Sequence, residues 1–394
     1  MRRLIVVAAA VLGGVVLLGL LSGGAGVGND VPVSAQNSCD DPFAGETVRF
    51  NTNYWTLTDF CQRSVPLGEF RSGGPPPDGI PPIDDPQFES IAIARGWLEP
   101  QSPVIKVEIN GEAKAYPLSV LIWHEIANDE LGGVPIAATF CPLCNSAIVF
   151  DRTVRDEVLD FGVSGNLRNS DLVMYDRQTE SWWQQFTGEA LVGEYTGTNL
   201  EIIPSLVIGF GQFAEQYPEG LVLSRDTGAS RNYGANPYVG YDQTSDPFLF
   251  EGEVDRRLPA TAHVLAGMIG GEAVAYPFDS LVREVVINDT VGGRPVVALW
   301  QSGVVSALDS RDIDASRDVG MAALYDRTLD GQTLSFTFDG EVIRDNETNS
   351  VWNTFGQATE GELAGSQLQL QVAAPHFWFA WAAFQPDTFV YGLE

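Results

Sequence analysis

Two of the four cysteines of this chain stand close enough in sequence to carry chemistry together. Cys141 and Cys144 enclose Pro142 and Leu143, and thiols at this spacing can form a disulfide, exchange with another disulfide or bind a soft metal ion. The segment lies between two stretches with strand character. Thioredoxin-type proteins instead carry such a pair at a helix N-terminus, where the helix dipole stabilises a thiolate. The turn therefore has the geometry of a metal knuckle, although it supplies only two of the four ligands that structural zinc requires.

A third group follows from the expected hairpin before the motif. If residues 124–129 pair with residues 134–140 across an even-length turn, His124 and Cys141 share one face of the sheet. A three- or five-residue turn would place them on opposite faces. A nearby imidazole can lower the pKa of a thiol, accept its proton or bind a metal ion. The alternative is that His124 is a hydrogen-bonded wall residue. His376 lies in an aromatic run and is expected to pack in the core.

The other two cysteines, Cys39 and Cys61, are expected to form a structural disulfide. A crosslink closing a loop of about 20 residues typically contributes around 3 kcal/mol. Disulfides persist in exported proteins, and the N-terminus indicates export: Arg2-Arg3 precedes the apolar stretch from Leu4 to Leu21, and small residues follow. This pattern predicts a cleaved signal peptide or a retained N-terminal anchor.

Export would place the chain in the periplasm, outside the cell or at the outer face of the cytoplasmic membrane, with membrane contact only through the possible anchor. The formal net charge is −30 at pH 7. No run of lysines and arginines interrupts this acidity, and phosphate binding needs clustered positive charge, so the composition argues against a nucleic-acid partner.

An internal repeat organises the rest of the chain. Residues 104–136 recur as residues 264–296 at a constant offset of 160, including the Asn110-Gly111 turn region and the Ala-Tyr-Pro segments. Further on, Tyr175-Asp176-Arg177 is matched to Tyr325-Asp326-Arg327, which suggests a structural ion pair or turn rather than catalysis. The offset places Gln301, Val304 and Glu284 where the first copy has Cys141, Cys144 and His124. Loss of all three candidates together indicates a shared function and argues against a requirement for folding.

The predicted fold is a β-rich α+β structure with two tandem copies of a mainly antiparallel β module, each with a short helix near its end. The predicted organisation is, in chain order, a signal peptide or anchor (1–35), a Pro/Gly-rich lead-in (36–100), a first module with the Cys-Pro-Leu-Cys site (101–224), an irregular linker (225–260) and a second, degenerate module (261–394).

Three segments resemble a known bacterial family: residues 72–86, Thr139–Asn145 and Tyr233–Tyr238. The chain is similar to the domain-of-unknown-function family 3179 over nearly everything after about Thr58. The family has no established activity to carry over. Some members are described as selenoproteins, with selenocysteine within the segment that matches Cys141 to Cys144. The resemblance therefore implies redox chemistry, because selenium is poorly suited to a merely structural crosslink.

Three hypotheses follow. In the leading one the protein is an extracytoplasmic thiol–disulfide or peroxide-type redox protein, a possible thiol oxidoreductase. Cys141 attacks, Cys144 resolves and His124 lowers the pKa of Cys141, with no required cofactor and an unknown redox partner or small oxidant. In the alternative, Cys141, Cys144 and His124 bind copper or zinc. In the third, the chain is a non-catalytic exported binding module with an inert Cys141–Cys144 link.

Overall fold

The asparagine–glycine turn of the sequence forms a tight hairpin in the computed structural model, which describes residues 39–393. Strand β3 (Pro103–Ile109) pairs antiparallel with β4 (Glu112–Pro117), and Ile109 lies opposite Glu112. Asn110 and Gly111 both have positive φ angles, 53° and 82°. A two-residue hairpin turn of this type requires positive φ at both positions, which asparagine and glycine tolerate best.

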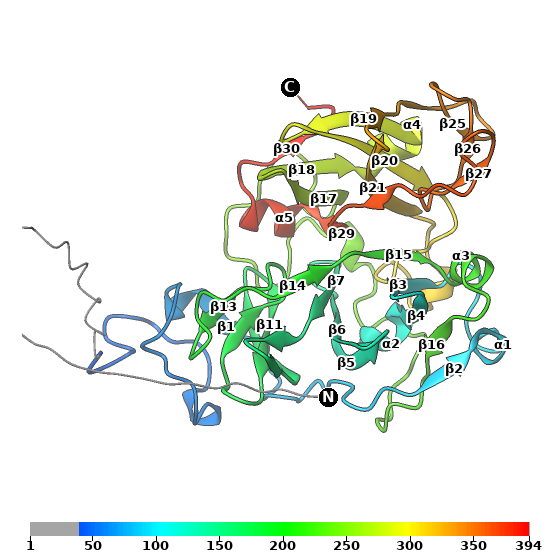
Figure 1. Cartoon of the computed structure of the whole chain (residues 1–394). Helices are drawn as coiled ribbons and strands as arrows, with labels where there is room; N and C mark the ends of the chain where they lie inside the picture. The colour runs from blue at the N-terminus through cyan, green and yellow to red at the C-terminus, as the bar shows by residue number, and fades with distance from the viewer. Residues whose placement is uncertain (1–38, 394) are drawn as a thin grey trace, which may run out of the picture. The chain divides into compact units, whose positions relative to one another are not determined.

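Three sheets follow one another in the first half of the chain, residues 70–223 (Figure 1). The β3–β4 hairpin lies inside a five-stranded sheet, and the cysteine motif lies in a four-stranded one. In spatial order the sheets are β15 (Ser205–Gly209), β3, β4, β16 (Leu221–Leu223) and β2 (Phe88–Ser90); β14 (Glu201–Ile203), β7 (Ser146–Asp151), β6 (Val134–Cys141) and β5 (Ile126–Leu131); and β1 (Phe70–Ser72), β10 (Phe161–Arg168), β11 (Asp171–Asp176), β12 (Trp182–Gln184) and β13 (Ala190–Val192).

Three further sheets form the second half, residues 263–390. In spatial order they are β29 (Ala373–Phe377), β17 (His263–Ile269), β18 (Glu272–Pro277) and β30 (Phe389–Val390); β19 (Val286–Val291), β20 (Arg294–Gln301), β21 (Met321–Asp326) and β28 (Gln369–Leu370); and β24 (Phe336–Phe338), β25 (Ile343–Asp345), β26 (Val351–Trp352) and β27 (Ala358–Glu360). Each half adds one small hairpin: β8 (Thr153–Val154) with β9 (Glu157–Val158), and β22 (Thr328–Leu329) with β23 (Gln332–Thr333).

Helices are few and short, so the predicted β-rich class with mainly antiparallel sheets is confirmed. The described residues hold no helix with the length and apolar character needed to cross a membrane. The helices are α1 (Ile91–Ala94), α2 (Leu118–Leu121), α3 (Phe210–Gln216), α4 (Phe278–Glu284) and α5 (Trp378–Phe384), with single 3-10 turns η1 (Thr52–Tyr54), η2 (Leu67–Glu69), η3 (Tyr241–Gln243) and η4 (Ile313–Ala315).

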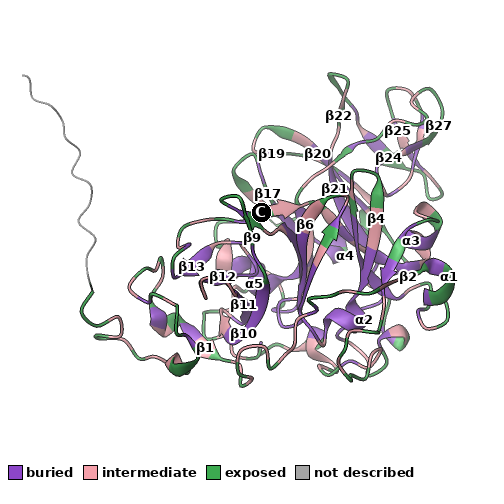
Figure 2. Cartoon of the chain, turned by 60° about the horizontal axis from the view of Figure 1, so that its bottom comes forward, coloured by how far each residue is buried: buried purple, intermediate pink, exposed green. Residues whose placement is uncertain are grey.

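Of the described residues, 41–393 form one compact unit. Burial is concentrated along the sheet strands, and β11 is buried over its whole length (Figure 2). The largest hydrophobic cluster joins residues of both halves, including Phe140 of β6 and Phe377 of β29. The two halves therefore share a core, and the second half also has a smaller hydrophobic cluster of its own, which includes Leu265 and Tyr276.

One arginine in each half makes the same kind of contact. Arg152, just after β7, donates to the carbonyl oxygen of Leu159 at 2.9 Å, and Arg327, just after β21, donates to that of Leu334 at 2.7 Å. Asp326-Arg327 thus matches Asp151-Arg152 by contact. The sequence had matched it to Asp176-Arg177 because both segments read Tyr-Asp-Arg, whereas Asp151-Arg152 follows a phenylalanine.

Asp176 has a different counterpart. Its carboxylate accepts hydrogen bonds from the backbone of Thr179 at 2.7 Å and from the indole of Trp183 at 2.9 Å. Asp345 accepts the same pair of bonds from Thr348 and from Trp352, the latter at 2.9 Å. Each aspartate thus holds one hairpin together: Asp176 the β11–β12 hairpin and Asp345 the β25–β26 hairpin.

The segments outside the sheets are also ordered by specific contacts. Cys39 and Cys61 are both disulfide-bonded, in agreement with the predicted structural disulfide. Residues 225–260, predicted as an irregular linker, contain only the short turn η3 among helices and strands. Several of their aromatic side chains nevertheless pack against the largest core cluster. The predicted signal peptide or anchor, residues 1–35, lies outside the described residues.

Candidate functional site

The Cys-Pro-Leu-Cys motif forms the tight turn between β6 and β7. Cys141 is the last residue of β6 and lies opposite Ser146, the first residue of β7, so only residues 142–145 form the connection. Asn145 closes the turn with a φ of 49°, a left-handed conformation that asparagine adopts more readily than most residues. Cys141 therefore ends a strand, and Cys144 lies within the turn that follows it. Both are free thiols and both are buried.

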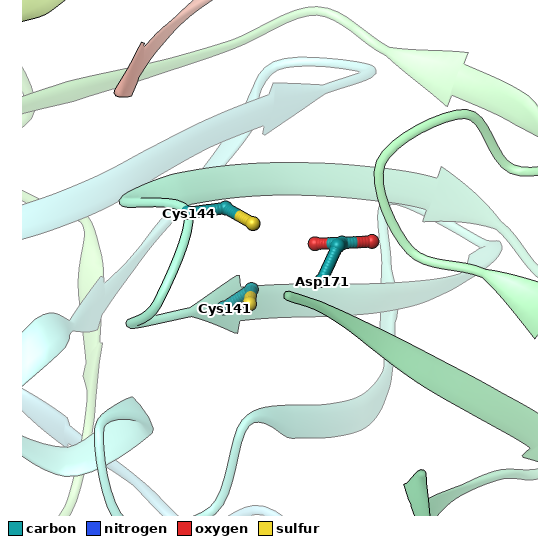
Figure 3. Close-up of side chains that lie close together, drawn as sticks. All are labelled: Cys141, Cys144 and Asp171. Atoms are coloured by element: carbon teal, nitrogen blue, oxygen red, sulfur yellow. The ribbon is translucent and has the colours of Figure 1, made fainter. Parts of the chain in front are cut away.

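Asp171 is the third member of this site. It begins β11, on a different sheet, and one of its carboxylate oxygens lies within 4.8 Å of both sulfur atoms, which are themselves within 4.8 Å of each other. Figure 3 shows both sulfurs and the carboxylate of Asp171 directed into the same space. The three residues are exposed by only 2% for Cys141 and by 0% for Cys144 and Asp171. The group Cys141, Cys144 and Asp171 is called the dithiol site below.

The carboxylate of Asp171 is fixed by neighbours from the next strand. Its Oδ2 accepts hydrogen bonds from Gln184 Nε2 at 2.6 Å and from the backbone N–H of Phe186 at 3.0 Å. Its Oδ1 is buried and has no hydrogen-bond partner of nitrogen or oxygen among the described residues. Thiols are weak hydrogen-bond donors. The arrangement therefore leaves one carboxylate oxygen available for a proton or a cation beside the sulfurs.

Glu125 adds a second buried acid. It follows α2, and its φ of 61° is unusual for a residue other than glycine. Two backbone hydrogen bonds hold this conformation: its N–H donates to Leu121 at 2.7 Å, and its carbonyl accepts from Phe140 at 2.8 Å. Burial, with the charge of Asp171 as a smaller cause, raises the pKa of Glu125 to about 8. Glu125 is thus largely protonated at neutral pH.

All four acids of this region are shifted toward their neutral forms. Burial raises the pKa of Cys141 above its ordinary value, and it raises the pKa of Cys144 further. Burial also raises the pKa of Asp171 to about 6, against hydrogen bonds that favour its ionised form. A buried charge without a partner is costly, so the two thiols and Glu125 stay protonated at neutral pH, whereas Asp171, with a pKa of about 6, is mostly ionised there. Cys141 is the thiol that ionises more readily of the two.

His124 is not brought to the sulfurs. Its Nδ1 is 2.6 Å from the carbonyl oxygen of Pro81, and its Nε2 is 2.7 Å from the hydroxyl of Tyr233. The predicted register is present, since Leu131 pairs with Val134 across a two-residue turn. However, β5 begins only at Ile126, and the left-handed conformation of Glu125 turns the chain between His124 and the strand. The face-sharing argument fails because it extended a regular strand through this break.

The imidazole instead ties two segments together over the first half. Pro81 belongs to the proline-rich lead-in, and Tyr233 to residues 225–260. Burial lowers the pKa of His124, so the ring is neutral at neutral pH. Next to it the indole of Trp123 donates to the carbonyl of Ala235 at 3.2 Å. His124 is therefore the hydrogen-bonded wall residue that the sequence left open as the alternative.

Residues 225–260 cover the dithiol site and are called the cover segment below. Tyr238 and Tyr241 come from this segment, and the pKa of each is raised first by burial and then by nearby acids, which include Cys141 in both cases. The cover segment is also fixed to the strand that carries Asp171. The hydroxyl of Ser170 donates to the carbonyl of Phe248 at 2.5 Å. The sequence had suggested a linker, but the segment forms a wall of the site.

The second half supports the cysteine turn from the other side. The backbone N–H of Phe377 donates to the carbonyl of Cys144 at 2.9 Å. The side-chain amide of Asn145 is 3.5 Å from Nδ1 of His263. His376 lies apart, stacked on Trp381 with ring centroids 5.5 Å apart, which agrees with the packing role expected from the sequence.

A family comparison matches most of the chain. Residues 77–388 match the model of a protein family of unknown function, DUF3179. The chain belongs to the DUF3179 family. This confirms the resemblance seen in the sequence, and the matched range includes the dithiol site, the cover segment and both halves. Searches of curated proteins and of solved structures find no match.

Proposed function

We propose that this DUF3179 protein is an extracytoplasmic thiol–disulfide oxidoreductase whose redox centre is the Cys141–Cys144 pair. The observation that carries the proposal is the buried carboxylate of Asp171 within 4.8 Å of both sulfurs. Dithiol chemistry needs a group that accepts the proton of the second thiol when that thiol attacks. Asp171, with a pKa raised to about 6, is suited to accept and return a proton near neutral pH. It takes the place that the sequence had given to His124.

The reaction is a two-electron exchange with a disulfide substrate. Cys141, as thiolate, attacks one substrate sulfur, forms a mixed disulfide and releases the other substrate sulfur as a thiolate. Cys144 then gives its proton to Asp171 and attacks the sulfur of Cys141, which forms the Cys141–Cys144 disulfide and releases the second substrate sulfur. Cys141 is assigned the attack because it is the slightly exposed thiol and its pKa is the less raised of the two.

The electrostatics favour electron donation over oxidation of partners. Oxidising dithiol proteins stabilise their thiolate, and this stabilises the reduced form. Here burial and acidic neighbours raise the pKa of both thiols. The disulfide is then the relatively favoured form, so we expect a reduction potential at or below that of thioredoxin, about −270 mV. The partner would be a protein disulfide or a small oxidant reached outside the cytoplasm.

The second half is proposed to be a duplicated module that serves as scaffold. The shared contacts of Arg152 and Arg327, and of Asp176 and Asp345, support one ancestral fold. The turn that holds the thiols is replaced in the second half by the long connection of residues 302–320 between β20 and β21. Val285, with a φ of 62°, takes the place of Glu125. The second half thus has the same left-handed backbone conformation at Val285 as the first half has at Glu125, but without the carboxylic acid.

A zinc site is the second candidate, favoured by a different observation. The cysteine turn joins two antiparallel strands, and three ligand atoms of Cys141, Cys144 and Asp171 lie within 4.8 Å of one another. Two thiolates and a carboxylate oxygen are ligands that zinc accepts. Copper(I) prefers sulfur and imidazole ligands. Because the third candidate ligand is the carboxylate of Asp171 and not the imidazole of His124, zinc fits this site better than copper. A bound Zn²⁺ would compensate the buried negative charge of the two thiolates and Asp171.

One set of measurements separates the two functions. The purified mature protein is analysed for bound metal, and the motif is then equilibrated with glutathione or dithiothreitol redox buffers and its thiols are trapped. Metal-free protein with a defined, reversible potential at or below about −270 mV supports the redox function. Stoichiometric zinc that Asp171→Asn and Cys144→Ser both abolish supports the metal site. Thiols that neither titrate reversibly nor retain metal would leave an exported binding module.

A further inference from the structure

A cavity of about 150 Å³ lies where the proline-rich lead-in crosses the sheet that contains β1 and β10. The turn η1, the end of β1 with the loop that follows it, and β10 form its walls. β1 pairs with β10 at the edge of this sheet (Figure 2). The cavity shares no residue with the dithiol site, and its lining residues that matter below are Asn51, Tyr54, Trp55, Ser72 and Asn166.

A bulge in β10 shapes one wall of this cavity. The pairing of β10 with β11 shifts between Val163 and Asn166, so two residues, one of them Gly165, bulge out of the ladder. Gly165 has a φ of 74°, and a Cβ at this position would collide with the backbone carbonyl of Pro75. The lead-in can therefore approach closely, and the N–H of Gly73 donates to the carbonyl of Gly165 at 2.8 Å. Bulges can re-aim a side chain, and here Asn166, directly after the bulge, lines the cavity.

Two deeply buried side chains of the lining carry polar groups that the fold leaves unpaired. Asn166 is 5% exposed and Trp55 is 6% exposed. Neither the side-chain amide of Asn166 nor the indole N–H of Trp55 makes a hydrogen bond among the described residues, yet both polar groups keep some surface accessible to solvent. Buried polar groups in folded proteins nearly always have a partner. A molecule in the cavity can supply one to the amide of Asn166.

The rest of the lining is neutral and hydroxyl- or amide-bearing. None of the described residues that line the cavity is charged. Ser72 Oγ accepts from the N–H of Gly74 at 3.1 Å and still has its own proton to donate, and Asn51 adds a second amide at the rim. Tyr54 is 50% exposed and offers an aromatic ring there. A charged ligand would lose its hydration without gaining a compensating charge, so the lining selects a neutral molecule with several hydroxyls and one apolar face.

We propose that this cavity binds one ring of a neutral sugar, a hexose without an acidic or amino group. Its hydroxyls would exchange hydrogen bonds with the amide of Asn166 and with the rim groups of Asn51 and Ser72. Its C–H face would pack against the ring of Tyr54. The volume agrees with this size, because an engineered cavity of about 150 Å³ in another protein holds benzene, which is also a six-membered ring.

The test uses the whole mature protein and titrations followed by ligand-observed saturation-transfer NMR. Of D-glucose, D-galactose and D-mannose, at least one should bind saturably with a Kd of about 1 mM or below. The uronate of that hexose should bind about tenfold more weakly, because no cation in the lining meets its charge. Absence of saturable binding for all three hexoses, or equal binding of the matching uronate, overturns the proposal. If the methyl glycoside binds as well as the free hexose, the ligand is the end of a glycan; if it does not, the ligand is the free sugar.

Two variants and a matched control locate the site. Asn166→Leu keeps a branched side chain and removes no side-chain hydrogen bond within the described protein, so it should fold as stably as the wild type while hexose affinity falls about tenfold. Tyr54→Ala removes an exposed ring and should weaken binding about three- to tenfold.

Leu57→Ala is the control, because Leu57 is 61% exposed and lies outside the lining, and its hexose affinity should equal that of the wild type. Unchanged affinity in either Asn166→Leu or Tyr54→Ala contradicts the proposed site. Cys144→Ser should also leave the affinity unchanged, so a failure of the redox proposal is distinguishable from a failure here.

Discussion

Replacement of His124 by alanine tests how the dithiol site is closed. The side chain holds the lead-in through the carbonyl of Pro81 at 2.6 Å and the cover segment through the hydroxyl of Tyr233 at 2.7 Å. Each lost hydrogen bond reduces stability by about 1 kcal/mol. Tyr233 keeps the hydroxyl of Thr227 at 2.5 Å as a partner, whereas the Pro81 carbonyl loses its imidazole donor. The local cost is therefore about 2 to 3 kcal/mol.

The consequence should be seen at the thiols. If the cover segment opens locally, a loss of about 2 kcal/mol raises the open population about 30-fold, since each 1.4 kcal/mol is a factor of ten. Labelling of Cys141 and Cys144 by an aromatic disulfide reagent under native conditions should accelerate by about the same factor. The pH midpoint of thiol reactivity should stay unchanged, because the imidazole is neutral and contacts neither sulfur.

A matched control distinguishes local opening from general destabilisation. Trp352→Phe removes the indole hydrogen bond to Asp345 at 2.9 Å in the second half and should lower the melting temperature without accelerating native-state labelling. The reasoning is refuted if His124→Ala lowers the melting temperature while labelling stays slow, or if both variants accelerate labelling equally. A shift in the pH midpoint of thiol reactivity in His124→Ala would instead show that His124 influences the ionisation of the thiols.

Three further predictions concern the buried acids. Asp171→Asn should slow resolution of the mixed disulfide at Cys141 by about 10²-fold or more, so that mass spectrometry detects the mixed disulfide; undiminished resolution would remove Asp171 from the mechanism. Glu125→Gln should stabilise the reduced, metal-free protein at alkaline pH. The pKa of Glu125 is about 8 in the folded protein and near 4.5 in the unfolded chain. The wild type therefore has its full stability below pH 4.5 and loses the contribution of the protonated Glu125 as the pH rises through 8, whereas the glutamine variant does not titrate. Urea denaturation should give a difference from wild type that grows to about 3 to 5 kcal/mol by pH 8 and is absent at pH 4; a pH-independent difference contradicts it. Asp176→Ala and Asp345→Ala should each lower the free energy of unfolding by about 2 to 4 kcal/mol, because each removes an equivalent buried acceptor; a near-neutral Asp345→Ala would argue against equivalent hairpins.

Local sequence signals predicted much of the fold. The Asn110-Gly111 turn fixes the register of the β3–β4 hairpin as expected, and the β5–β6 hairpin has a two-residue turn, one of the even-length turns that the sequence left open. The expected short helix near the end of each half is also present, as α3 and α5. These features depend on residues adjacent in sequence, where turn chemistry and hydrophobic pattern act directly.

The partners of the cysteines were not predictable in the same way. Asp171 lies on another sheet and reaches the sulfurs only through tertiary packing, so its spacing of 27 residues from Cys144 carries no pattern. The one available signal was a charged residue at the start of an otherwise apolar run, Leu172 to Tyr175. His124 was wrongly placed beside the sulfurs because glutamate at position 125 gives no sign of a left-handed backbone conformation. Val285 shares that conformation, which shows that the surrounding fold imposes it and the residue type does not.

The backbone hydrogen bond from Phe377 to the carbonyl of Cys144 has a practical consequence for dissecting this chain. A fragment that stops near residue 224 would contain both thiols and Asp171, but it would lack the strand that holds the cysteine turn and the tyrosines that close over it. In such a fragment the two thiols should become exposed to solvent and open to oxidation, and the distance between their sulfur atoms should no longer be fixed. Whatever the thiols do, they do it with the second half and the cover segment in place.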